Sequence, residues 1–116
     1  MDVVIYHNPA CGTSRNALSL IRDAGIEPTI AEYLRNPPDF AALKTLLDRM
    51  GVRARDVLRE KEGTYAQLGL AADHWSEDEL IRQMVSHPVL INRPIVITAS
   101  GAALCRPAHR VLDLLK

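Results

Sequence analysis

The first third of the chain alternates between strand-like and helix-like segments, and this order constrains the fold more than any other feature. Residues 3–6 form a short β-branched apolar run that is typical of a buried strand. A helical pattern runs to about Ala24 and stops at Gly25, and residues 29–33 predict a second strand. Strand, helix and strand within so few residues predict a βαβ unit with parallel strands and a right-handed crossover.

A polar loop joins the first strand to the first helix. This thiol loop (residues 7–12) has the sequence His-Asn-Pro-Ala-Cys-Gly, which is rich in turn-forming residues. Thr13 or Ser14 is expected to cap the helix that follows. The sequence therefore predicts that Cys11 lies close to the beginning of a helix.

The middle of the chain is predicted to be mainly helical. The break Asn36-Pro37-Pro38 comes first, and apolar residues then recur at helical spacing. The expected elements are a helix from Phe40 to Gly51, a shorter helix over 54–59, and mostly loop over 60–75 with a turn around 65–68. Ser76 and Glu79 form a capping-box pattern, which predicts another helix directly after them.

Strand patterns return near the C-terminus. Residues 95–98 form a buried-type strand, Ser100-Gly101 predicts a hairpin turn, and residues 102–105 form a short partner strand. Pro107 can open a last helix. The complete order predicts an α/β fold of thioredoxin-like layout. It has a small mixed four-stranded sheet and a helical insertion between its βαβ and ββα halves.

Composition narrows the class of protein further. The 116 residues suit a single domain over 1–116, and no repeat or long linker divides them. The 14 basic and 14 acidic residues balance, which argues against non-specific nucleic-acid binding. No apolar run reaches the roughly 20 residues of a membrane span, and no secretory signal is visible. Two cysteines are too few for a disulfide scaffold. We therefore expect the protein to work in the reducing cytoplasm.

Cys11 is the sharpest chemical feature. A cysteine beside the first N–H groups of a helix experiences the positive end of the helix dipole, which favours the reactive thiolate. The alternative is a buried structural cysteine, which is the more frequent role of a free cysteine. The polar, glycine-containing loop makes burial less expected here, so the sequence favours a reactive thiol.

No second thiol lies at the position that a dithiol mechanism needs. Three residues after Cys11 the chain has Ser14, so a local C-x-x-C exchange is excluded. An adduct on Cys11 must then be resolved by a thiol from elsewhere. Cys105 is the only internal candidate, and filling the short last strand explains it more readily.

In a phosphatase-type loop, an arginine six residues after the cysteine binds the oxyanion. Here that residue is Ala17, so an oxyanion near Cys11 would need arginines from other parts of the chain. The planar guanidinium group of an arginine binds an oxyanion with two parallel hydrogen bonds. Any single arginine, however, is more often a solvated surface residue. Three arginines stand out by context: Arg59, Arg93 and Arg106.

The histidines give weaker indications of a functional role than the arginines. His7 lies four residues before Cys11, where it can assist the thiol or an anion, or be merely structural. The other three have no metal-ligand spacing, so no metal site is expected. They are His74, His87 and His109.

These local signatures converge on one family. The segments over residues 6–16, 87–96 and 104–107 resemble the active-site segments of the glutaredoxin-coupled arsenate reductases, and the likeness covers essentially the whole chain. The resemblance implies that Cys11 is the nucleophile, and that His7 and Ser14 support the thiol. It implies that Pro94 is the cis-proline opposite the cysteine. The matching oxyanion-binding residues are Arg59, Arg93 and Arg106.

The resemblance also implies a reaction and its partners. Arsenate would be reduced to arsenite through a Cys11 adduct, with glutathione as co-substrate, glutaredoxin as partner protein and no bound cofactor. One departure is that this chain stops soon after its last helix, whereas better-known members carry a longer tail. Two alternatives stay open: a redox-sensing regulator of the same fold, which would favour a second cysteine at position 14, and a thiol enzyme acting on glutathione adducts.

Overall fold

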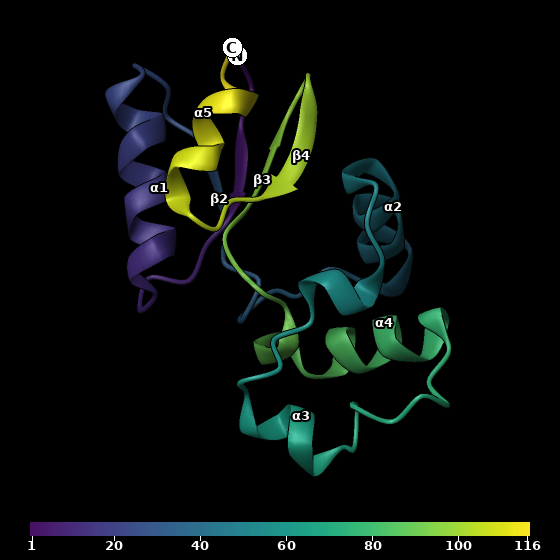
Figure 1. Cartoon of the computed structure of the whole chain (residues 1–116). Coiled ribbons are helices and arrows are strands. Elements are labelled where there is room, and N and C mark those ends of the chain that lie inside the picture. The colour runs from purple at the N-terminus through teal and green to yellow at the C-terminus, as the bar shows by residue number, and fades with distance from the viewer. The chain divides into compact units, whose positions relative to one another are not determined.

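The computed structural model describes all residues 1–116 and divides into two compact units (Figure 1). The first unit joins Met1–Asn36 to Arg93–Lys116, and the second unit is Pro37–Asn92. All four strands belong to the first unit. That residues 1–116 act as one domain stays a prediction.

The first unit is built on the mixed four-stranded sheet that the sequence predicts. Its strand order is β2-β1-β3-β4, with β1 parallel to β2 and the other two pairs antiparallel. The strands are β1 (Val4–Tyr6), β2 (Thr29–Ala31), β3 (Ile95–Thr98) and β4 (Gly101–Leu104). The parallel pairing of β1 and β2 confirms the βαβ prediction.

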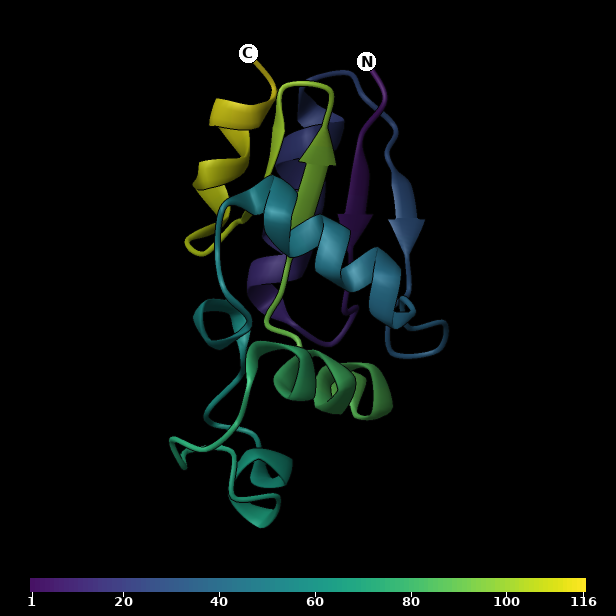
Figure 2. The same ribbon diagram turned by 90° about the vertical axis from the view of Figure 1, so that its right-hand side faces the viewer.

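Two helices cover one face of this sheet (Figures 1 and 2). They are α1 (Gly12–Asp23) and the short α5 (Val111–Leu114), which follows a 3-10 turn at Ala108–Arg110. Apolar residues of α1 recur with the helical period and face the strands, and each fully buried aliphatic side chain contributes roughly 1.5–3 kcal/mol. The core contains Val3, Ile5, Ala17, Leu18, Ile21, Val96, Cys105 and Val111.

The beginning of α1 differs from the prediction. Cys11 itself is the N-cap residue, and no side chain caps the helix there. Neither Thr13 nor Ser14 is the cap, so that expectation was wrong. The Ser14 hydroxyl instead lies near His7 and accepts a hydrogen bond from the Asn8 N–H. The thiol therefore lies directly at the helix start.

The hairpin of β3 and β4 is also shifted by one residue from the prediction. Thr98 pairs with Gly101, so the turn is Ala99-Ser100 and Gly101 already belongs to β4. The hydroxyl groups of Thr98 and Ser100 both contact the Leu114 carbonyl, at 3.2 and 3.1 Å. These contacts attach the turn to the end of α5.

The second unit is helical. It contains α2 (Phe40–Met50), α3 (Gly63–Gln67) and α4 (Glu77–Ser86), with 3-10 turns at Ala54–Val57 and Pro88–Leu90. The Asp39 side chain caps the start of α2, and Gly51, with a φ of 70°, is its C-cap residue. The region 60–75 was expected to be mostly loop with one turn, but it holds the five-residue helix α3.

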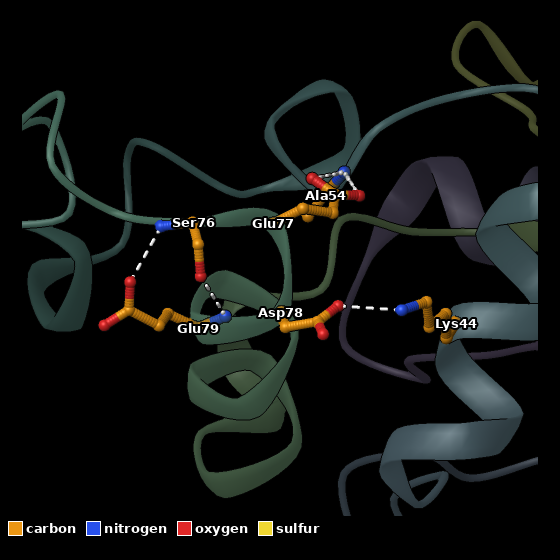
Figure 3. A network of polar contacts seen from close by, with 6 residues as sticks. All are labelled: Lys44, Ala54, Ser76, Glu77, Asp78 and Glu79. Carbon is orange, nitrogen blue, oxygen red and sulfur yellow. Dashed lines mark hydrogen bonds and ion pairs between the residues drawn. The ribbon is translucent and has the colours of Figure 1, made fainter.

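The first turn of α4 connects three parts of the second unit (Figure 3). Ser76 and Glu79 form the predicted capping box, with bonds of 2.9 and 3.1 Å. The Glu77 carboxylate accepts from the Ala54 N–H, and Asp78 pairs with Lys44 of α2 at 2.9 Å. Three consecutive acidic residues thus fix the cap, the first 3-10 turn and α2 relative to α4.

Candidate active site

Cys11 is buried more deeply than the sequence suggested. Its side chain is 8% exposed, although a polar loop carries it. Part of its surroundings is nevertheless cationic, because Nη1 of Arg106 lies 3.7 Å from the Cys11 sulfur. The expectation of an unburied thiol was therefore wrong, but the environment is not the apolar one of a structural cysteine.

The pKa of the Cys11 thiol is lowered. Burial raises it, but hydrogen bonding from the Ser14 N–H and from the Arg93 and Arg106 side chains lowers it by more. The positive charge of Arg93 acts in the same direction. The thiolate is the nucleophilic form of cysteine, so this site favours the reactive state.

The two arginines reach the thiol because of the β3–β4 hairpin. Arg93 precedes β3 and Arg106 follows β4, and the pairing continues past the strands with Cys105 N–H donating to Pro94 O at 2.8 Å. Nη1 of Arg106 also donates to the Arg93 carbonyl at 2.9 Å. The hairpin thus brings both arginines to the same end of the sheet.

His7 and Ser14 form a buried polar pair beside the thiol loop. His7 Nδ1 lies 2.7 Å from Ser14 Oγ, and both residues are buried. Burial lowers the pKa of His7; Glu32 opposes this effect, and Arg22 and Arg15 reinforce it. A neutral His7 can orient the Ser14 hydroxyl while the Ser14 N–H faces the thiol.

Sequence reasoning missed two residues that shape the thiol loop. The Asn8 side chain accepts from the Ala10 N–H at 3.0 Å, and the Asn8 carbonyl accepts from the Cys11 N–H at 3.0 Å. Nη1 of Arg15 donates to the Pro9 carbonyl at 2.8 Å. An Asn at the start of a turn is a known signal for the first contact, whereas no local pattern announces the second.

Arg59 belongs to the second unit. Its N–H donates to the Leu90 carbonyl at 2.7 Å, next to an isolated bridge between Leu58 and Ile91. Its Nε lies 3.2 Å from a Glu62 carboxylate oxygen. The structure brings together Arg93 and Arg106, whereas the grouping of Arg59 with them stays a prediction.

Cys105 has the opposite surroundings to Cys11. It follows β4 directly, is fully buried, and belongs to the apolar core of the first unit. Burial raises the pKa of its thiol to about 11. Its position agrees with the interpretation of Cys105 as a packing residue.

The Arg93–Pro94 peptide is cis, as the resemblance implied for Pro94, and Arg106–Pro107 is cis as well. No group of three or more His, Cys, Asp or Glu side chains is gathered closely enough to hold a metal ion. No helix has the length and apolar character needed to cross a membrane.

The sheet, the lowered thiol pKa and the adjacent arginines define a class of thioredoxin-like thiol proteins with cationic side chains beside the thiol. Within this class, the chain belongs to the ArsC family, whose model matches residues 6–114. The chain is 53% identical to an arsenate reductase of Rhizobium meliloti (strain 1021) over 115 residues, covering 99% of this chain and 82% of that protein.

Two further relatives agree with this assignment. An arsenate reductase of Escherichia coli is 54% identical over 115 residues, again covering 99% of this chain and 82% of that protein. The solved structure of an arsenate reductase from Vibrio cholerae matches with a TM-score of 0.94 and 41% identity, covering 97% of each chain. The fold and the sequence thus point to the same family.

Proposed function

We propose that this protein is an arsenate reductase, an oxidoreductase that converts arsenate to arsenite through an adduct on Cys11. The observation that carries the proposal is the lowered pKa of the Cys11 thiol beside Arg93 and Arg106. The support from relatives is their shared name at 53% and 54% identity over nearly the whole chain.

In the first step, the Cys11 thiolate attacks the arsenic atom of arsenate and forms a sulfur–arsenic bond. One arsenic–oxygen bond breaks, and its oxygen leaves as water after accepting protons. Arsenic stays at oxidation state V in this adduct. Arg93 and Arg106 neutralise the oxyanion and the departing oxygen, since their guanidinium groups bind such charge with directed hydrogen bonds.

In the second stage, glutathione supplies the electrons together with Cys11. Its thiol attacks the arsenylated cysteine, the two sulfurs end as a mixed disulfide, and arsenic leaves as arsenite at oxidation state III. Glutaredoxin then reduces the mixed disulfide and restores the Cys11 thiol. Two thiols are oxidised for each arsenate reduced, so the electrons balance.

The surroundings of Cys105 support the need for outside thiols. A thiol with a pKa of about 11 in the apolar core is a poor attacking group at neutral pH. Ser14 stands where a dithiol enzyme would have its second cysteine. Dependence on glutathione and glutaredoxin fits the reducing cytoplasm, where we propose that the protein works.

The remaining predicted site residues have supporting roles in this proposal. Ser14 stabilises the thiolate with its N–H, and His7 orients Ser14 through the 2.7 Å contact. Arg59 is proposed as a third anion-binding arginine on the family resemblance alone. Its ion pair with Glu62 would then exchange for a contact with the oxyanion.

A coupled assay tests the proposal. NADPH consumption is followed with glutathione, glutathione reductase and glutaredoxin, with and without arsenate. We expect consumption that needs arsenate, glutaredoxin and Cys11 together. Consumption that does not depend on arsenate would instead indicate a thiol enzyme acting on glutathione adducts, and no consumption at all would favour a regulator.

A further inference from the structure

The peptide between Pro9 and Ala10 is held from both sides. Nη1 of Arg15 donates to the Pro9 carbonyl at 2.8 Å, and the Ala10 N–H donates to the Asn8 side chain at 3.0 Å. This peptide is trans, so its C=O and N–H point in opposite directions. Two side chains from different elements therefore fix the orientation of one peptide plane.

The same side chains bracket Cys11. The Arg15 N–H donates to the Cys11 carbonyl at 3.0 Å, as the first bond of α1, while its guanidinium reaches back to Pro9. The Asn8 carbonyl accepts from the Cys11 N–H at 3.0 Å. The backbone on each side of Cys11 is thus tied to Asn8 and Arg15.

We propose that Asn8 and Arg15 are positioning residues, which clamp the Pro9–Ala10 peptide and thereby hold the Cys11 thiol against the Ser14 N–H and the two neighbouring arginines. The clamp matters because Pro9 and Ala10 are both exposed, so burial in the core does not fix them. A displacement of about 1 Å at a reacting group can cost on the order of a hundredfold in rate.

Charge alone does not explain the role of Arg15. The interactions that lower the pKa of Cys11 come from Ser14, Arg93 and Arg106, and Arg15 is not among them. Arg15 is exposed, so water weakens its field. Its charge acts on His7, and we assign its influence on the thiol to the geometry of the loop.

The test combines Arg15→Met, Asn8→Ala and the double variant in two measurements. The first measurement is the pH dependence of Cys11 alkylation by iodoacetamide, scored at Cys11 by mass spectrometry, without arsenate. We expect each single variant to move the midpoint upward, toward the unperturbed thiol pKa of about 8.5. The second is steady-state arsenate reduction, which rests on the proposed function, and kcat should fall about tenfold with a smaller change in KM.

The double variant separates a shared clamp from two independent effects. Releasing either side frees the same peptide, so the combined loss should be clearly smaller than the product of the single losses. Arg15→Lys should recover most of kcat, because one ammonium N–H can still reach the Pro9 carbonyl. Multiplying losses, or an unchanged alkylation midpoint in folded Arg15→Met, would overturn the proposal.

Arg22→Met is the matched control. Arg22 lies on the same helix, is exposed, and pairs with Glu27 rather than with the thiol loop. It should leave the alkylation midpoint and kcat unchanged, and an equal shift in both arginine variants would mean that charge, not the clamp, acts on Cys11. If alkylation shifts as expected but turnover does not require arsenate, the clamp stands and the proposed function fails.

Discussion

The two cysteines of the first unit are both buried, and their thiol pKa values shift in opposite directions. Cys11 is 8% exposed and Cys105 is 0% exposed. The pKa of Cys11 is nevertheless lowered, whereas that of Cys105 is raised to about 11. Burial raises both values, and only at Cys11 do other groups more than offset it.

Cys11 has directed donors, and Cys105 has apolar neighbours. Cys11 has the Ser14 N–H and the guanidinium groups of Arg93 and Arg106, while Cys105 packs within the core and directs its sulfur toward the Ala103 carbonyl at 3.6 Å. A carbonyl oxygen can accept a hydrogen bond from a neutral thiol, but it has no proton to donate and so does not stabilise a thiolate. The donors around Cys11 thus outweigh the effect of burial on its pKa, whereas Cys105 has no comparable donors to offset its burial.

The largest expected effect is at Cys11. Cys11→Ser should lower arsenate reduction by more than about a thousandfold, because a serine hydroxyl is not ionised at neutral pH and is a weak nucleophile. Activity in the coupled assay and circular dichroism check this result. Substantial turnover by the folded variant would show that Cys11 is not the nucleophile.

The next largest effect is expected at Arg93, one of the donors beside the Cys11 thiol. Arg93→Lys keeps the charge but loses the planar fork, so kcat/KM for arsenate should fall by roughly ten- to a hundredfold. We expect both kcat and KM to change, since the arginine meets charge in the bound anion and in the leaving oxygen. Steady-state kinetics with varied arsenate measure this. An unchanged kcat/KM would place Arg93 outside the site and would weaken the assignment of Arg106.

The difference between the thiols should also appear in their titration. In the native protein, Cys11 should be alkylated by iodoacetamide with a midpoint well below the unperturbed value of about 8.5, and oxyanions should slow the reaction. Cys105 should react only after unfolding, because it is fully buried. Mass spectrometry of alkylated protein over a pH series distinguishes the two sites. A Cys11 midpoint at or above the unperturbed value would contradict the role of the donors.

The smallest effect on activity is expected at Cys105. Cys105→Ser should keep most of the turnover, since glutathione supplies the second thiol, while the free energy of unfolding falls by about 1–3 kcal/mol because a hydroxyl is buried in the core. Denaturant unfolding and the coupled assay measure the two quantities. Lost activity with unchanged circular dichroism would make Cys105 a resolving residue.

The pH dependence of stability gives a second measurement at the same residue, with Cys105→Ala as the variant. The folded pKa of Cys105 is raised, so its contribution is complete below the pKa of the unfolded thiol and is lost as the pH rises toward about 11. Wild type should therefore lose more stability than Cys105→Ala over this range. Parallel unfolding curves for the two proteins would mean that Cys105 ionises as easily in the fold as in the unfolded chain.

The elements with strong local patterns were predictable from sequence. The β-branched runs at residues 3–6 and 95–98 gave strands, and Ser76 with Glu79 gave the start of α4. The helix α3 was missed because its five residues carry no apolar period. The hairpin turn was misplaced because Ser100-Gly101 is a good local turn, whereas strand pairing set the turn at Ala99-Ser100.

The candidate site shows the same division. The position of Cys11 at a helix start followed from the order of elements, and its partners Arg93 and Arg106 from their sequence context and the family resemblance. The N-cap residue of α1 could not be predicted from the local sequence. Ser14 has the right chemistry for a cap, but its hydroxyl group contacts His7 and the Asn8 N–H instead. Contacts formed only after folding, such as Arg15 with Pro9, leave no signature in the sequence.

The register of the β3–β4 hairpin determines where this protein can accept inserted or deleted residues. Arg93 and Arg106 flank a ladder in which Ile95 pairs with Leu104 and Thr98 with Gly101. Residues added at Ala99-Ser100 lengthen the turn and leave the ladder, and hence the separation of the arginines, unchanged. Removing one residue from β4 would shift Arg106 by about 3.3 Å along the strand and reverse the face of the β4 side chains that follow the deletion. Length variation among homologues should therefore concentrate at the turn, and designed loop grafts belong there.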